Sequence, residues 1–254
     1  MKSQSREFYD RFADKYDVMI SSKRYDMDVP FFKSVFKKHG VKSVLDCACG
    51  TGLHVIKLSQ LGFEAAGCDA SGEMVEKAKR NAAALGVKVN FVQADFKRLT
   101  SVFGEKFDCV VCLGSLNHEL KDKGMLSALR SMYNVLKDKG VVVVGIRNLP
   151  KLVEEKKRIF PMHFHKEPNG DRKLFVYVLD FCRSKVTFNV VSFLEFDGEP
   201  KFEVDSVDYR IVSAEKLEAL MSQVGFKELE VYGDHEFTEF RDDNSENIVV
   251  IGTK

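Results

Sequence analysis

The sequence predicts an α/β fold, with a doubly wound, mostly parallel seven-stranded sheet and a small antiparallel β insertion. Three observations lead to this prediction. Between Val44 and Leu61 an apolar run ends in a glycine-rich turn, after which apolar residues recur at helical spacing. Up to residue 150, short apolar runs then alternate with amphipathic stretches, the order typical of parallel strands joined by crossover helices. Residues 173–212 alternate apolar and polar side chains with a period of two, which indicates antiparallel strands.

The order of elements divides the chain into four parts. Residues 1–40 form a helical N-terminal segment, 41–150 an α/β core, 151–212 the antiparallel insertion on the substrate side, and 213–254 the completion of the core sheet. Within the first part, a second helix is expected from about Asp28, with Pro30 in its first turn, where a missing N–H costs nothing. The expected strands are 42–45, 63–68, 87–92, 107–113, 141–146, 173–181, 184–196, 202–212, 226–232 and 247–252.

The glycine turn, Asp46-Cys-Ala-Cys-Gly-Thr-Gly52, indicates what kind of ligand binds. Its glycines let the backbone turn sharply and approach a ligand closely. Asp69 ends the next strand about twenty residues on, where an acid accepts hydrogen bonds from ribose hydroxyls in this architecture. Val55 replaces the third glycine of a dinucleotide site, and Asp46 would repel a pyrophosphate but suit a cationic amino group. The turn therefore predicts a nucleoside ligand that carries a cationic amino group.

Polar side chains follow two central strands, at the edge where ligands bind in this architecture. Asn117 and His118 come after the strand 107–113 and are expected to face the reaction chamber. A lone histidine is more often structural, but at this position it is a candidate substrate contact or base. Arg147-Asn148 closes the next strand, where an arginine suits a bidentate grip on a carboxylate; the alternative is a salt bridge at the domain edge.

The glycine turn with its preceding acid, in register with Asp69, resembles the motifs of class I S-adenosylmethionine (AdoMet) methyltransferases. Ala48 stands where the first glycine is commoner, and the alternative is an α/β turn with incidental acids. The segment Phe8 to Asp17 also looks like the N-terminal lid of many small-molecule methyltransferases, with its second Tyr-Asp near the cofactor. The positions that the resemblance implies for AdoMet binding are Tyr16, Arg24, Asp46, Ala48, Gly50, Gly52, Asp69, Ala70, Met74, Asp95, Phe96 and Leu113.

Within that superfamily the chain looks most like the glycine and sarcosine N-methyltransferases. It shares the cysteine-containing glycine turn, the Asp69-Ala-Ser pattern, Cys-Leu-Gly after the strand 107–113, Arg147-Asn148 and the β insertion. Ser115 departs from the pattern, because those enzymes usually have an asparagine there. The resemblance implies that Arg24 holds the AdoMet carboxylate and Arg147 the carboxylate of the acceptor.

The resulting prediction is an enzyme that transfers a methyl group from AdoMet to the amine of a small carboxylate-bearing acceptor and releases S-adenosylhomocysteine (AdoHcy). Methyl transfer is expected by in-line displacement at the sulfonium methyl, with His118 or solvent taking the proton of the amine. Asn117, Arg147 and Asn148 are the expected acceptor contacts. Two alternatives stay open: a C- or O-methyltransferase acting on a molecule such as a quinone precursor, and a protein that binds AdoMet without turnover.

Composition bears on partners and location. Lysine plus arginine number 39 against 38 acids, with a net charge of +1, so the electrostatic footprint of a nucleic-acid binder is missing. Neither a signal peptide nor a stretch of membrane-spanning length stands out, so a cytoplasmic protein without a membrane partner is expected. Most of the six cysteines lie in or beside predicted strands; Cys109 and Cys112 are predicted to be buried free thiols, and no disulfide and no metal is expected. Self-association is left open.

Overall fold

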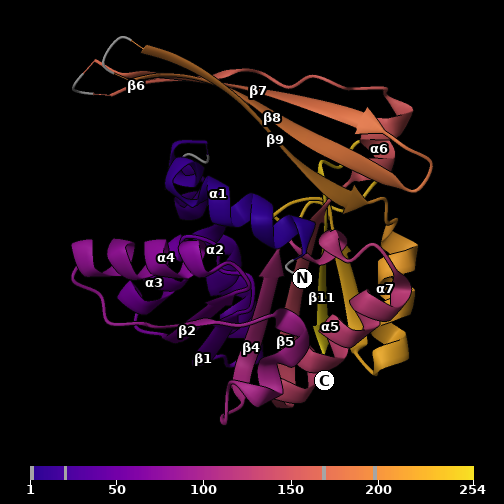
Figure 1. Ribbon diagram of the computed structural model, residues 1–254. Coiled ribbons are helices and arrows are strands. Elements are labelled where there is room, and N and C mark those ends of the chain that lie inside the picture. The colour runs from indigo at the N-terminus through magenta and orange to yellow at the C-terminus, as the bar shows by residue number, and fades with distance from the viewer. Residues whose placement is uncertain (1–2, 20–21, 168–169, 197–198) are drawn as a thin grey trace.

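The main sheet has seven strands in the order β10-β11-β5-β4-β1-β2-β3 in the computed structural model, which describes residues 3–19, 22–167, 170–196 and 199–254 (Figure 1). Strand β11 runs antiparallel to its neighbours β5 and β10, and the strands from β5 to β3 are parallel. The predicted fold class is confirmed. The strands are β1 Ser43–Asp46, β2 Glu64–Asp69, β3 Asn90–Gln93, β4 Phe107–Leu113, β5 Leu136–Arg147, β10 Lys227–Tyr232 and β11 Asn247–Thr253.

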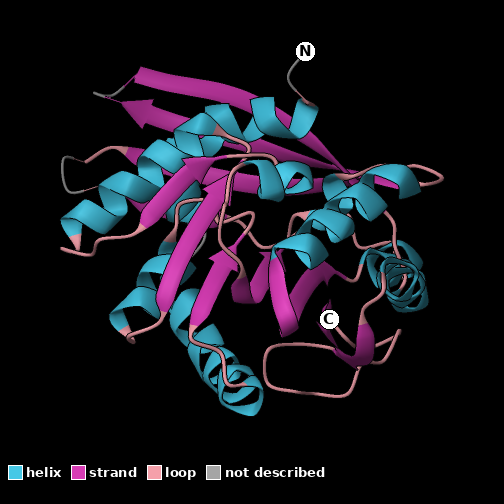
Figure 2. Ribbon diagram, turned by 90° about the horizontal axis from the view of Figure 1, so that it is seen from below, coloured by secondary structure: helices cyan, strands magenta, loops and turns pink. Residues whose placement is uncertain are grey.

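Helices cover both faces of this sheet because its central strands are apolar on both sides (Figures 1 and 2). Aromatic side chains of α2, among them Phe32 and Phe36, pack with α3 on one face. Leu129 of α5 and Leu217 of α7 belong to the core on the other face. The helices are α1 Gln4–Met19, α2 Ser22–His39, α3 Leu53–Gln60, α4 Gly72–Ala84, α5 Asp122–Val135, α6 Leu149–Glu154 and α7 Ala214–Val224, with 3-10 turns η1 Phe96–Ser101 and η2 Leu116–His118. No helix in these described ranges is long and apolar enough to cross a membrane.

The insertion is a separate antiparallel sheet of four strands, β6 His163–Lys166, β7 Arg172–Phe181, β8 Lys185–Phe196 and β9 Glu199–Arg210. The sequence predicted only three of them. Strand β6 was missed because it is four residues long and lies in a stretch without regular alternation. Helix α1 lies between this sheet and helices α2 to α4 (Figure 1), with Phe8 and Phe12 packed against Phe175 and Val207.

Two predicted boundaries are corrected. Helix α2 begins at Ser22 rather than near Asp28, so Pro30 lies inside it. A proline in a helix interior costs about 3 kcal/mol, and here burial of the neighbouring Phe31 and Phe32 offsets that cost. Strand β5 begins at Leu136 rather than 141 because Lys139 takes a positive φ of 62° and lets the strand continue through an irregularity in its pairing with β4.

Candidate active site

The turn between β1 and α3 can contain only glycine at its last position. Gly52 has a φ of 79°, and a Cβ added there would lie 2.6 Å from Cζ of Phe91 and 2.8 Å from Cβ of Ala78. Gly50 also has a positive φ of 53°. The backbone can therefore pass close under α4 and β3, and the amides of the turn come to the carboxyl edge of the sheet.

Two acids flank this turn. The carboxylate of Asp69, at the end of β2, accepts the N–H of Gly50 at 3.0 Å and that of Ser71 at 2.9 Å. Asp46, at the end of β1, is buried and accepts the N–H of Ala48 at 3.3 Å. Burial raises the pKa of Asp46 to about 6 and also raises the pKa of Asp69, although backbone hydrogen bonds act in the opposite direction. A cation beside Asp46 would compensate its buried charge.

Helix α1 lies over the turn. Thr51 donates its hydroxyl to Asp17 at 2.6 Å, and the ring atom Cε1 of Tyr16 lies 3.7 Å from the Cβ position of Gly50. About two turns earlier in α1, Asp10 accepts the hydroxyl of Ser71 at 2.6 Å. The structure thus brings the Tyr16-Asp17 pair to the glycine turn.

The next predicted cofactor positions lie along the same edge. Met74 is buried in the first turn of α4, whose N-cap is Ser71, and the carbonyl of Ala70 accepts the side-chain amide of Gln93 at 3.1 Å. Asp95 caps η1 by accepting the N–H of Lys97 at 2.9 Å. Phe96 packs against the main core, and Leu113 is the last residue of β4. The side chain of Arg24 lies outside the described residues.

Beyond β4, His118 meets Tyr9 and Tyr209, neither of which was predicted as a site residue. Its Nδ1 lies 3.2 Å from the carbonyl of Asp208, and because a carbonyl only accepts, Nδ1 carries the proton. Its Nε2 then accepts the hydroxyl of Tyr9 at 3.0 Å, and that oxygen lies 3.3 Å from the hydroxyl of Tyr209. Burial lowers the pKa of His118 to about 4, so its ring is neutral at pH 7. No sequence signal points to Tyr209, because it comes from β9 of the insertion.

Asn117 lies beside His118 in η2 and is fully buried. Its side-chain oxygen has no hydrogen-bond partner among the residues that the structure describes. A buried acceptor without a partner costs about 1–3 kcal/mol, and a bound ligand that donates a hydrogen bond would remove that cost. Asn117 is thus suited to contact a ligand at the end of β4.

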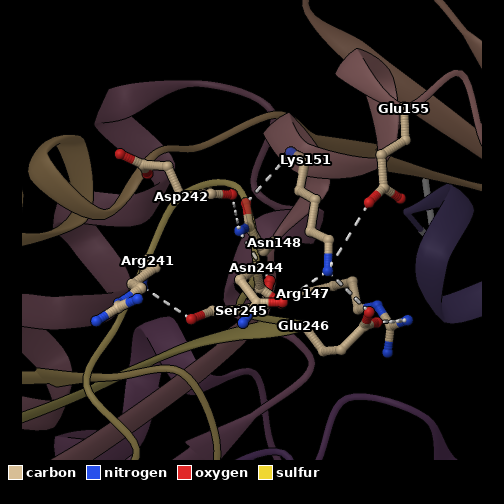
Figure 3. A network of polar contacts seen from close by, with 9 residues as sticks. All are labelled: Arg147, Asn148, Lys151, Glu155, Arg241, Asp242, Asn244, Ser245 and Glu246. Carbon is tan, nitrogen blue, oxygen red and sulfur yellow. Dashed lines mark hydrogen bonds and ion pairs between the residues drawn. The ribbon is translucent and has the colours of Figure 1, made fainter.

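Arg147 and Asn148, at the end of β5, differ in what holds them (Figure 3). Arg147 donates to Glu246 at 2.6 Å, and its guanidinium lies 5.7 Å from the centre of the Phe160 ring. Asn148 is buried; it caps α6 and donates to the carbonyls of Asp242 and Ser245, both at 3.0 Å. The predicted acceptor contact of Asn148 is corrected, because both amide hydrogens are used to hold the loop before β11.

The edge of the sheet therefore carries the parts that a nucleoside with a cationic amino group requires. Glycines allow close approach, Asp69 presents carboxylate oxygens at the end of β2, and Asp46 offers a buried negative charge. The oxygen of Asn117 offers a further acceptor. These are the features expected of an AdoMet site, and together with the fold they point to the class of AdoMet-dependent methyltransferases.

Comparisons with known proteins agree. A methyltransferase domain family matches residues 44–140. A glycine/sarcosine N-methyltransferase of Aphanothece halophytica is 30% identical over 248 residues, covering 93% of this chain and 86% of that protein. One from Halorhodospira halochloris is 28% identical over 98% of this chain and 90% of its own length. A solved AdoMet-dependent methyltransferase from Clostridium acetobutylicum superposes with a TM-score of 0.80 at 19% identity, covering 96% of this chain and 98% of its own.

The chain belongs to the family of AdoMet-dependent methyltransferases, as its sequence predicted. AdoMet is its cofactor, and the glycine/sarcosine N-methyltransferases are among its relatives within that family.

Proposed function

We propose that this methyltransferase acts on the amine of a small carboxylate-bearing acceptor that resembles glycine or sarcosine. The relatives named above are glycine/sarcosine N-methyltransferases, and they span almost the whole chain. The observation that supports the proposal most is Arg147, a guanidinium at the carboxyl end of β5. Such a group recognises a planar carboxylate with two parallel hydrogen bonds.

The cofactor supplies a methyl group on a sulfonium, whose sulfur leaves as a neutral thioether. In the proposal, Asp69 accepts the ribose hydroxyls, Asp46 lies toward the amino group and Arg24 toward the carboxylate of the ligand. Met74, Asp95 and Phe96 surround the adenine. The remaining contacts come from Tyr16, Ala48, Gly50, Gly52, Ala70 and Leu113.

On the acceptor side, the chain mainly positions the nucleophile. The oxygen of Asn117 accepts an N–H of the amine, and Arg147 exchanges part of its contact with Glu246 for the acceptor carboxylate. His118 orients Tyr9 rather than acting as the base, because both of its nitrogens are hydrogen-bonded within the protein and its pKa is low. Pre-alignment of reactants supplies up to about 7–11 kcal/mol.

The test is AdoHcy release from AdoMet with glycine, sarcosine and dimethylglycine offered separately. Turnover of at least one amine is expected. Silence with all three, together with measurable AdoMet binding, would contradict the proposed acceptor and favour the C- or O-nucleophile alternative.

Arg147→Ala tests the carboxylate grip. A charge-assisted hydrogen bond contributes about 1.5–3 kcal/mol, so the acceptor KM should rise by about 10- to 100-fold while AdoMet affinity stays unchanged. Arg158→Ala is the control, because Arg158 also forms an exposed ion pair, with Asp180, but lies on the insertion. Equal acceptor KM values in both variants would remove Arg147 from the acceptor site.

A further inference from the structure

A buried carboxylate shared by two histidines lies on the α2 side of the main sheet. Asp28 of α2 accepts Nε2–H of His54, from α3, at 2.9 Å and Nδ1–H of His235, from the loop after β10, at 2.5 Å. Burial alone would raise the pKa of Asp28, but the hydrogen bonds from His235 and His54 lower it overall, so the carboxylate is ionised. None of these three residues is among the predicted cofactor or acceptor contacts.

The second nitrogen of His235 is the unusual atom of this cluster. Its Nε2 is buried and has no hydrogen-bond partner within the described part of the chain. The centre of the His235 ring lies 5.0 Å from the centre of the Phe31 ring, and this contact fixes the plane of the imidazole. Because Nδ1 keeps its proton and donates it in the hydrogen bond to Asp28, Nε2 of the neutral ring carries a lone pair and is an acceptor.

Nε2 of His235 lies near the carboxyl ends of β4 and β5, where the predicted site residues are. Nε2 lies 4.0 Å from the Cβ position of Gly145, and Gly145 pairs with Leu113 at the end of β4. Gly145 and Arg147 lie two residues apart in β5 and so point to the same face of the sheet. A Cβ at Gly145 would lie 2.7 Å from Cδ2 of Leu113, so the side chain of Leu113, a predicted cofactor contact, borders the space beside Nε2.

We propose that His235 is the base that prepares the acceptor, with Asp28 as its positioning residue. The inference rests on the proposed amine acceptor. An amine arrives as an ammonium; Nε2 takes one of its protons, which leaves the nitrogen a lone pair. That nitrogen then bonds to the methyl carbon while the carbon–sulfur bond breaks with its electron pair on sulfur. The imidazolium, stabilised by Asp28, returns its proton to solvent, and the product leaves as a methylated ammonium.

The charged groups that face His235 suit this role. Asp28 lies on α2, His54 on α3 beyond that carboxylate, and Asp234 precedes His235 in its own loop and interacts with it electrostatically. The two carboxylates place negative charge beside the ring of His235. On β5, the facing position is the uncharged Gly145.

Two variants separate chemistry from packing. His235→Asn keeps a donor toward Asp28 but removes Nε2, and His235→Phe keeps an aromatic ring against Phe31 but removes both nitrogens. We expect acceptor kcat/KM to fall by about 10²- to 10⁴-fold in each at pH 7, with unchanged AdoMet affinity. The loss should shrink as pH rises and the free amine forms in solution. His39→Asn, at the far end of α2, is the control.

If the wild type turns over an amine and His235→Phe matches it in rate and pH profile, only this inference is overturned. If the wild type turns over no amine, the proposed function and this inference fail together.

An observation without turnover tests the same geometry. In ¹⁵N-labelled protein at pH 8, the signals missing from His235→Asn should show a proton on Nδ1 and none on Nε2 of His235. Asp28→Asn should shift the ring toward a mixture of tautomers. A proton on Nε2 in the wild type would overturn the inference.

Discussion

At the scale of single residues, the turn between β1 and α3 combines a strained backbone conformation with a buried charge. Gly52 has a positive φ, which is unfavourable for residues with a side chain, and the carboxyl group of Asp46 is buried. Both features lower stability relative to an ordinary turn and give a ligand room and a counter-charge. Each can be tested by one substitution.

Gly52→Ala should destabilise the protein by about 2–4 kcal/mol, because a methyl group there would overlap Phe91 and Ala78 in addition to the cost of a positive φ. Gly62→Ala is the matched control. Gly62 also has a positive φ, of 91°, but nothing lies within 4 Å of its Cβ position, so only about 1–2 kcal/mol is expected. Urea denaturation measures both; equal losses would mean that the close packing under the turn is not present.

Asp46→Asn should raise the stability of the ligand-free protein at pH 7 and weaken AdoMet binding. The pKa of Asp46 is about 6 when folded against about 4 when unfolded, so the folded state holds its proton more tightly. The contribution of Asp46 to the free energy of unfolding is fully present below pH 4 and is lost as pH rises through 6. At neutral pH, the buried carboxylate therefore lowers the free energy of unfolding by roughly 3 kcal/mol.

Denaturation of wild type and Asp46→Asn at pH 5 and pH 7.5 would measure this cost. The stability gap between the two proteins should be larger at the higher pH, and calorimetry should show weaker AdoMet binding by the variant at pH 7.5. A gap that does not change with pH would contradict the raised pKa.

At the scale of elements, the loop before β11 is held by a side chain from the start of α6. Asn148 caps α6 and donates to the carbonyls of Asp242 and Ser245, while Lys151 reaches Glu246 and the carbonyl of Asn244 (Figure 3). The same Glu246 pairs with Arg147. One short helix thus fixes the loop that sets the surroundings of the proposed carboxylate site.

Asn148→Ala should cost about 2–4 kcal/mol of unfolding free energy, since it removes a cap and leaves two loop carbonyls without their donor. Ser213→Ala, which removes only the cap of α7, should cost about 1 kcal/mol. The measurement is chemical denaturation of both variants. A loss for Asn148→Ala no larger than that for Ser213→Ala would show that the loop does not depend on it.

At the scale of the whole molecule, α1 joins the two sheets. Arg11 and Lys15 pair with Asp205 and Glu203 of β9, and Asp17 accepts hydrogen bonds from Thr51 and Asn81 of the main fold. Helix α1 therefore lies over the glycine turn with contacts above and below, as a lid over the cofactor would.

Asp17→Ala should loosen α1 without unfolding the sheets. Loss of the Thr51 and Asn81 contacts should speed amide exchange in residues 4–19 by several-fold, and added AdoHcy should restore part of the protection. Asp14→Ala removes only an exposed ion pair with Arg80 and should exchange like the wild type. Identical exchange in both variants would argue against the lid.

The sequence by itself determined the fold class, the glycine turn and the cofactor. These follow from local patterns, since apolar period, glycine positions and the acid at the end of β2 constrain neighbouring atoms along the chain. Only the tertiary structure decided which residues meet at the acceptor side. Tyr9, His118 and Tyr209 come from α1, η2 and β9, and Asp28 meets His235 across 207 positions. Such contacts depend on how α1, the insertion and the loop after β10 pack together. Short-range sequence patterns do not predict that packing.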